Sequence, residues 1–519
     1  MCARCLALLI VICPLLASEP PVEVVGDAGV ELSLAEAIEN ALAHNLGLIS
    51  ARTEAADAGD DVTIAASEFD PSLFGEVGLS ESQAAASGST LDSVSRPESE
   101  SRVARVGAEK LFASGATVTA SSNLNRRSSN NNSALNPDYT SNVGIDFTQP
   151  LIGGAGQRLN LAPLARARLR EDQSLFELRS DVLDVVVETE LAYWNLAFAL
   201  ENQALIGSRI ELAENLLEEN RERQRLGIVT SLEVLQAETE LLNQEEAAIL
   251  AEREIEETQD VLRRVMGVDS LLEPVEESLD VARIPLDLPS SREMPLVVRD
   301  AILSDTDAQA QAMAIEVQRI NEMLAKDASR VNLDLTGSLS YLGRDEDGFD
   351  AYSGAYGADG YNWDVGLALR FPWGFRGERA QINKARRAVE REELRLIELK
   401  EDKALSARNA WRAVDAGRQR VEVARKSLRL NEEAFEQERA RFGEGLIPYR
   451  QLLEAQRDFD DARSNYLTAR IQTVRAMARL GRIDGTILER NGLTWERVDR
   501  LELPDNLKER SSEEGDSIN

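Results

Sequence analysis

The two halves of the chain carry the same pattern of residues. Arginine, glycine, leucine and alanine fall at identical spacing in the stretches Arg223–Ala237 and Arg441–Ala455. An aromatic residue precedes the glycine of each stretch by 34 residues, Tyr193 in the first half and Trp411 in the second. Several anchors that keep both their order and their spacing indicate a duplicated structural unit.

Each half follows one order of expected elements: a helix, strands, a long helix, a glycine turn and a second long helix. The first repeat spans about residues 30–280, and the second about residues 290–485. Ser33 with Glu36 three positions later forms a capping-box pattern, which predicts a helix start. The corresponding helix of the second repeat is expected near Pro295.

The apolar period changes from 3.6 to 2 within about residues 72–151 and 331–371, which predicts strands there. Apolar side chains alternate with polar ones, and aromatic residues lie at the ends, as in outer-membrane barrels. A soluble antiparallel sheet with one wet face would show the same alternation. A further hairpin is possible within residues 102–126, but its alternation is poor and it has no assigned place. The alternating segments are 73–79, 139–147, 331–341 and 361–371.

Residues 1–18 have the layout of a secretory signal peptide, with Arg4 before an apolar run and small residues after it. The three cysteines all lie in this segment, so the mature chain is expected to contain no disulfide. No later segment offers 18 uncharged apolar residues, which a membrane-spanning helix needs. Export therefore favours membrane strands over a soluble sheet. At the other end, residues 486–519 are expected to form a polar tail.

The composition excludes several functions. The chain has 91 acidic and 58 basic residues, a formal net charge of -33, whereas nucleic-acid binding needs a basic surface. His44 is the single histidine, so histidine-based zinc sites and Ser-His-Asp catalysis are not expected. We predict no catalytic residue, no metal site and no cofactor.

Two proline-poor segments, about 157–226 and 377–442, are rich in Ala, Leu, Glu and Arg and are predicted to be long helices. About 70 helical residues extend roughly 105 Å, which exceeds the size of a globular domain. Helices of this length are expected to pair as coiled coils. The strand-to-helix junctions are expected at Pro150 with Gly153 and at Pro372 with Gly374.

About four good strands in one chain cannot close a membrane barrel, and open strand edges are not tolerated in lipid. A symmetric oligomer is the simplest closure. Several copies would then close one barrel above a ring of helices with a polar interior, which makes a water-filled conduit.

Several motifs make the chain resemble the TolC-type outer-membrane efflux and secretion channels over about residues 30–485. This resemblance implies an α+β membrane protein: a homotrimer with four strands from each protomer in a shared β-barrel, and duplicated coiled-coil hairpins that form a periplasmic tunnel. It also implies an outer-membrane location, a periplasmic adaptor protein and an inner-membrane pump. The motifs are Leu32–Ile38, Phe69–Pro71, Gln149–Leu151, Ala192–Trp194 and the two glycine turns.

In the family, the helix–turn–helix tips contact the adaptor. Exposed apolar residues beside a glycine at a helical tip suit a docking edge, although a simple helix-breaking turn would explain them too. The matching residues here are Gly227, Ile228, Val229 and Thr230 in the first half, and Gly445, Leu446 and Ile447 in the second.

The resemblance also places a pore constriction at the tips. Glu233 and Glu454 match acidic positions of the family, whereas Gln451 replaces an acid. The family's basic gate position holds Ile447, with Arg450 nearby, and its tyrosine becomes Phe442. Both glutamates could equally be ordinary exposed helix charges.

The leading hypothesis is a passive exit duct of a tripartite efflux or type I secretion system. The alternative is a soluble periplasmic coiled-coil adaptor or scaffold. Drugs, metals and secreted proteins are all compatible cargos.

Overall fold

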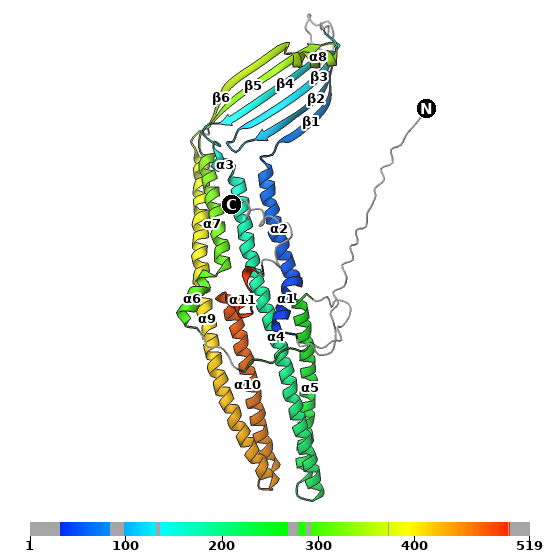
Figure 1. Ribbon diagram of the computed structural model, residues 1–519, viewed down its shortest axis with the longest axis vertical. Helices are drawn as coiled ribbons and strands as arrows, with labels where there is room; N and C mark the ends of the chain where they lie inside the picture. Colours follow the sequence, from blue (N-terminus) through cyan, green and yellow to red (C-terminus); the bar gives the residue numbers. More distant parts are fainter. Residues whose placement is uncertain are drawn as a thin grey trace, which may run out of the picture.

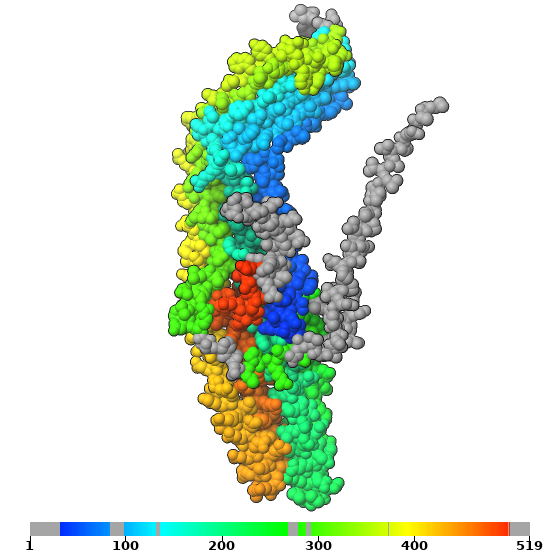
Figure 2. All heavy atoms as spheres, in the orientation of Figure 1, coloured from blue at the N-terminus to red at the C-terminus, as the bar shows by residue number. Residues whose placement is uncertain are grey.

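The computed structural model describes residues 32–83, 98–130, 135–267, 279–286, 292–371, 373–496 and 498. The expected signal peptide, Pro372, residue 497 and residues 499–519 lie outside the described residues. The molecule is long and narrow, with a β-sheet at one end and helical hairpins that reach to the other end (Figure 1 and Figure 2).

Six strands form one antiparallel sheet, and their order in the sheet is their order in the chain. The expectation of about four strands is therefore wrong in number. The additional pair is the hairpin of residues 98–129, which lies between the first strand and the fourth. The strands are β1 (Ser72–Gln83), β2 (Glu98–Leu111), β3 (Thr117–Ser129), β4 (Asp138–Pro150), β5 (Asn332–Asp345) and β6 (Gly360–Arg370).

Two long hairpins make up the helical body. In the first hairpin, α4 (Ala162–Arg225) turns into α5 (Ser231–Val265). In the second, α9 (Arg376–Gly443) turns into α10 (Tyr449–Ile483), so one hairpin lies in each half of the chain. At 1.5 Å per residue, α4 and α9 each extend about 100 Å. Both tips lie at the end of the molecule remote from the sheet (Figure 1).

Shorter helices support the long ones. Each half opens with a pair of them, and Ser33 caps the first of these helices together with Glu36, as the sequence predicts. The second helix of each pair leads into a strand and packs on a long helix, α2 on α4 and α7 on both α4 and α9. The helices are α1 (Leu34–His44), α2 (Leu46–Ser67), α6 (Met294–Leu303) and α7 (Thr306–Ala328); α3 (Gln157–Asn160), α8 (Gly348–Gly357) and α11 (Ile487–Arg490) are short.

Apolar cores lie in the middle of the helical body, which we call the waist, and at the tips. Tyr193, one of the repeat's aromatic anchors, is fully buried at the waist and donates its hydroxyl to the carbonyl of Leu32. Among the helices in the described ranges, none is both long enough and apolar enough to cross a membrane.

The segment after residue 486 departs from the expected polar tail, because Ile487, Leu488 and Val498 pack into the waist core. The Arg490 guanidinium of α11 holds the buried carboxylate of Glu190 with two hydrogen bonds of 2.6 and 2.8 Å. Up to Val498, the described part of this segment is thus packed against the long helices.

Candidate functional site

The two hairpin tips have the same backbone geometry. Gly227 and Gly445 adopt φ angles of +74° and +72°, a left-handed conformation that glycine reaches at little cost. The next amide in each turn closes back on the repeated arginine, since Ile228 N–H donates to the Arg223 carbonyl and Leu446 N–H to the Arg441 carbonyl, both at 2.9 Å. The duplicated spacing therefore encodes a duplicated helix-ending motif.

Apolar side chains are exposed at both tips. Ile228 and Leu446 are 65% and 64% exposed, and Leu226 next to them is similarly open. Val229 is half-buried and Thr230 is exposed. Exposed apolar groups beside a rigid turn suit a surface that a partner protein covers.

The expectation that Ile447 is an exposed docking residue is wrong. Its side chain is only 7% exposed, because it packs with Phe442, Tyr449 and Leu452 in the core that joins the two tips. Ile447 therefore stabilises the tip, and Leu446 is the apolar residue that the second turn presents to solvent.

Arg223 links the two tips, a role that the sequence analysis did not assign. Both of its terminal nitrogens donate to the Phe442 carbonyl at 3.1 Å, and its guanidinium lies 4.1 Å from the centre of the Phe442 ring. Arg223 also pairs with Glu219 on its own helix, as its repeat counterpart Arg441 does with Glu438, so the contacts with Phe442 are what distinguish Arg223. The repeat spacing marked both arginines, but only packing distinguishes their roles.

The expected constriction residues lie on the first turn of α5 and the first two turns of α10. Glu233 accepts a hydrogen bond of 2.9 Å from the backbone N–H of Thr230, the N-cap residue of α5, so the two residues form a capping box. Gln451 donates to Glu438 at 3.1 Å. Glu454 and Arg450 are exposed. Within one protomer these side chains do not form a shared cluster, so a constriction would need the same residues from several copies.

Buried polar groups lie in and beside the tip core. Burial raises the pKa of the Tyr449 phenol to about 12. Burial also raises the pKa of Asp460, against the opposing effect of Arg209, whose guanidinium lies 3.1 Å from the carboxylate. Within the described ranges, no group of three or more His, Cys, Asp or Glu side chains is placed to hold a metal ion.

At the other end of the molecule, the sheet has two chemically different faces. One face carries exposed apolar side chains on the outer strands, and large or small apolar residues on the inner ones. The other face carries Ser, Thr, Asn and charged side chains from all six strands. The exposed apolar set includes Leu73, Val77, Leu79, Val106, Ile145, Leu339, Tyr361, Trp363, Val365, Leu367 and Leu369.

The junctions between strand and helix show why the sequence needs glycine there. A Cβ atom on Gly153 would lie 2.3 Å from the Asn332 side chain, and the Gly153 N–H donates to the Val331 carbonyl at 3.1 Å. Gly374 adopts a φ angle of +92°. Pro150 ends β4, as expected for a residue without an N–H.

Comparisons with known proteins agree with this architecture. Outer membrane protein TolC from Vibrio cholerae is 22% identical over 382 residues, covering 72% of this chain and 82% of that protein. The Campylobacter jejuni CmeC outer membrane channel superposes with a TM-score of 0.65 at 16% identity, over 92% of this chain and 89% of that one. The Neisseria gonorrhoeae MtrE outer membrane channel gives the same score at 17% identity, over 89% and 91% of the two chains. At these identities, the structural likeness establishes the fold.

A family model described as outer membrane efflux protein matches residues 113–268 and 297–486, which include both hairpins and four of the six strands. The matched residues are well over half of the chain. The chain therefore belongs to the outer membrane efflux protein family.

Proposed function

We propose that the protein is the outer-membrane exit duct of a tripartite efflux or type I secretion system. The observation that carries this proposal is the sheet, which has one exposed apolar face, one polar face and free edges at β1 and β6. An apolar face of this extent needs a covering, and lipid covers it best when the strands continue into a closed barrel.

Copies of the chain would close that barrel by pairing β6 of one copy with β1 of the next. The two edge strands run in opposite directions, because an even number of antiparallel strands separates the edges, and the new pairing would be antiparallel as well. A homotrimer would contribute eighteen strands, three times the six of one chain. Barrels of about 16–18 strands enclose an aqueous channel.

The long hairpins would continue the conduit into the periplasm, where most of the chain would lie. The tips around Gly227 and Gly445 would dock a periplasmic adaptor through Ile228 and Leu446, with Val229 and Thr230 at the edge of that surface. The constriction would be formed by Glu233, Glu454, Arg450 and Gln451 from each copy, and rings of carboxylates would favour cations there. The duct itself would be passive, with the energy supplied by an inner-membrane pump, and residues 1–18 would direct export.

The alternative is a soluble periplasmic scaffold, which would share the hairpins. The exposed apolar face of the sheet disfavours it, since Val77 and Trp363 would then stand in water. A scaffold would also have no use for two free strand edges, which promote aggregation in solution.

Planar lipid bilayers test the proposal. Purified protein in detergent should insert and produce stepwise conductance, and it should precipitate when the detergent is removed without lipid. A protein that stays soluble without detergent and gives no conductance would refute the proposed duct and favour the scaffold.

A further inference from the structure

A short helix, α8, lies on the apolar face of the sheet near the strand ends that are remote from the long helices (Figure 1). Residues 348–357, between β5 and β6, thus form a helix. Gly343 of β5 allows the helix to pack closely on the strand, because a Cβ atom at this position would come within 1.9 Å of the Ala351 carbonyl oxygen. Ser141 of β4 is on the apolar face, where many side chains are exposed, but it lies under α8 and is only 1% exposed.

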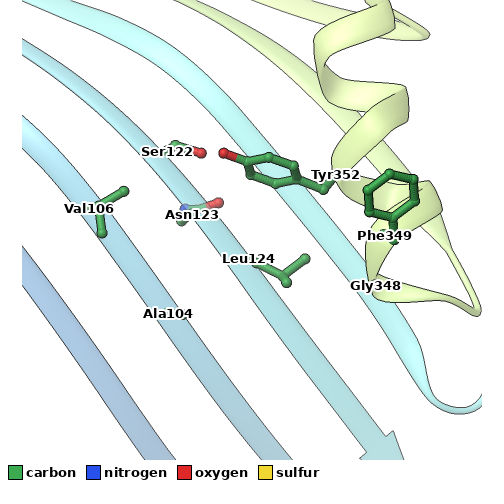
Figure 3. A pocket seen from close by; sticks show the side chains of 8 residues that line it. All are labelled: Ala104, Val106, Ser122, Asn123, Leu124, Gly348, Phe349 and Tyr352. Atoms are coloured by element: carbon green, nitrogen blue, oxygen red, sulfur yellow. The ribbon is translucent and has the colours of Figure 1, made fainter.

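Beside α8, the apolar face is hollowed by two adjoining cavities of about 370 and 510 Å³. Val106 and Ser122 line both cavities, so the two form one groove that starts beside α8 and continues over the neighbouring strands. Small side chains such as Ala104, Ala108 and Ala120 contribute to its floor. Figure 3 shows the hydroxyl of Tyr352, a residue of α8, pointing towards Ser122 of β3, with Phe349 on the same helix.

The backbone under the groove limits what could fill it. Strands β2, β3 and β4 are interior strands, and each is paired along both of its sides. A peptide segment laid in the groove would find few unpaired backbone groups below it, and burying its own amides would be costly. Water is equally disfavoured in an apolar cavity. The groove therefore suits a flexible, purely apolar chain.

The end of the groove next to α8 is bordered by positive charge. Arg102 and Arg126 are opposite each other in the register of β2 and β3, and each lies two positions beyond a residue of the groove, Ala104 or Leu124. Glu100 lies 2.6 Å from Arg102 and 3.7 Å from Arg126, so one carboxylate is shared by two guanidinium groups. The Nη1 atom of Arg126 is buried and has no hydrogen-bond partner among the described residues.

We propose that this groove is a lipid-binding site on the outside of the barrel: it holds one acyl chain of a phosphate-bearing membrane lipid, and Arg126 with Arg102 binds the phosphate. Arginine donates to phosphate through several fixed N–H groups, and the Arg126 Nη1 atom makes no hydrogen bond in addition to its 3.7 Å ion pair with Glu100. Helix α8, with Phe349, Tyr352 and Tyr356, would cover the chain at the membrane surface, where aromatic side chains are favoured. The site rests on the proposed function in one respect, namely that the apolar face lies in the membrane.

Native mass spectrometry of the whole, delipidated protein in detergent tests the site. The probes are phosphatidylglycerol and a diacylglycerol with the same chains. Ser122→Leu fills the groove, and Ser121→Leu places the same side chain on the opposite face of the same strand. Arg126→Ala removes the phosphate ligand, and Arg127→Ala is its neighbour on the opposite face.

We expect phosphatidylglycerol to bind about tenfold more tightly than the diacylglycerol, because hydrogen bonds to a charged group account for about one decade of affinity. Arg126→Ala should remove this preference, whereas Arg127→Ala should keep it. Ser122→Leu should weaken the binding of both lipids at least tenfold, and Ser121→Leu should not.

If Arg126→Ala and Arg127→Ala bind phosphatidylglycerol with equal affinity, the phosphate site is refuted. If Ser122→Leu and Ser121→Leu bind the two lipids with equal affinity, the groove is refuted. Bilayer conductance of the same variants separates this inference from the proposed function. Ser122→Leu and Arg126→Ala should conduct as the parent does, since the groove lies outside the pore. Lipid binding without conductance would refute the duct and leave the groove standing, and the reverse result would refute the groove alone.

Discussion

Replacing Arg223 with alanine should loosen the contact between the two hairpin tips. The change removes two hydrogen bonds from a charged guanidinium to the Phe442 carbonyl, both 3.1 Å long, and a ring contact 4.1 Å from the Phe442 centroid. Both bonds go to one carbonyl oxygen, so they count as one hydrogen bond with a charged partner, which contributes about 1.5–3 kcal/mol. A cation–π contact adds about 0.5–1 kcal/mol. The Arg223 side chain is 15% exposed, so solvent replaces little of this interaction.

We therefore expect Arg223→Ala to destabilise the joined tips by about 2–4 kcal/mol, which is at least about a thirtyfold increase in tip opening. Amide hydrogen exchange measured by mass spectrometry reports this directly. Protection should fall in residues 226–236 and 443–452, whereas the waist around Tyr193 should keep its protection, because local opening does not require global unfolding.

Arg441→Ala is the matched control, since Arg441 occupies the equivalent repeat position and pairs with Glu438 on its own helix. Exposed pairs of this kind contribute only a few tenths of a kcal/mol, so tip exchange should hardly change. Phe442→Leu keeps the carbonyl and loses the ring, and it should give an intermediate effect. Unchanged protection in Arg223→Ala, or the same loss in both arginine variants, would refute the tip-linking role.

Three further predictions concern other parts of the molecule. Arg490→Ala should destabilise the protein by about 3–5 kcal/mol in thermal unfolding, because it leaves the buried Glu190 carboxylate without its guanidinium partner, whereas Arg425→Ala, which breaks an exposed pair, should not. Burial raises the pKa of Asp460, so the contribution of this group to the free energy of unfolding is fully present below pH about 4 and is lost as the pH rises through the raised pKa. The stability of Asp460→Asn relative to the parent should therefore increase from pH 4 to pH 7. A stability difference that does not change with pH would contradict this. Gly343→Ala should displace α8 and speed amide exchange in residues 348–357, whereas Gly337→Ala on the same strand, whose Cβ would meet nothing closer than 3.7 Å, should leave α8 in place.

The long helices, their turns and the opening helix follow from the sequence because local signals specify them. The capping box at Ser33, the left-handed glycines Gly227 and Gly445, and proline-poor runs of good helix formers each act within a few residues. The same is true of the strands whose large apolar residues alternate, such as the stretch that ends at Phe371.

The hairpin of residues 98–129 could not be placed because its apolar face carries small side chains. Ala104, Ala108 and Ala120 leave the groove open beside α8, and a strand that leaves space for another group loses its strong alternation. Helix α8 itself contains three glycines and caps itself with Asp347, so its sequence is typical of a loop. Its packing on Gly343 is a tertiary contact that local pattern does not report.

At the tips, sequence spacing identified the turns but not the orientation of each side chain. Ile447 and Leu446 are adjacent and equally apolar, and only the shared core of the two hairpins buries one and exposes the other. Arg223 and Arg441 are equivalent by repeat, and the contact across the hairpins separates them.

Disulfide cross-linking between the sheet edges tests most directly whether neighbouring copies close one barrel. The cysteines of the chain all lie in residues 1–13, so introduced cysteines would have no competitors after export. Val77→Cys on β1 should be combined with Trp363→Cys, Val365→Cys or Leu367→Cys on β6, since all four positions lie on the apolar face. We predict that one combination gives covalent dimers and trimers in outer membranes, whereas Glu76→Cys, on the opposite face, gives none with the same partners. No cross-link in any combination, or equal yields from Glu76→Cys, would contradict the shared barrel.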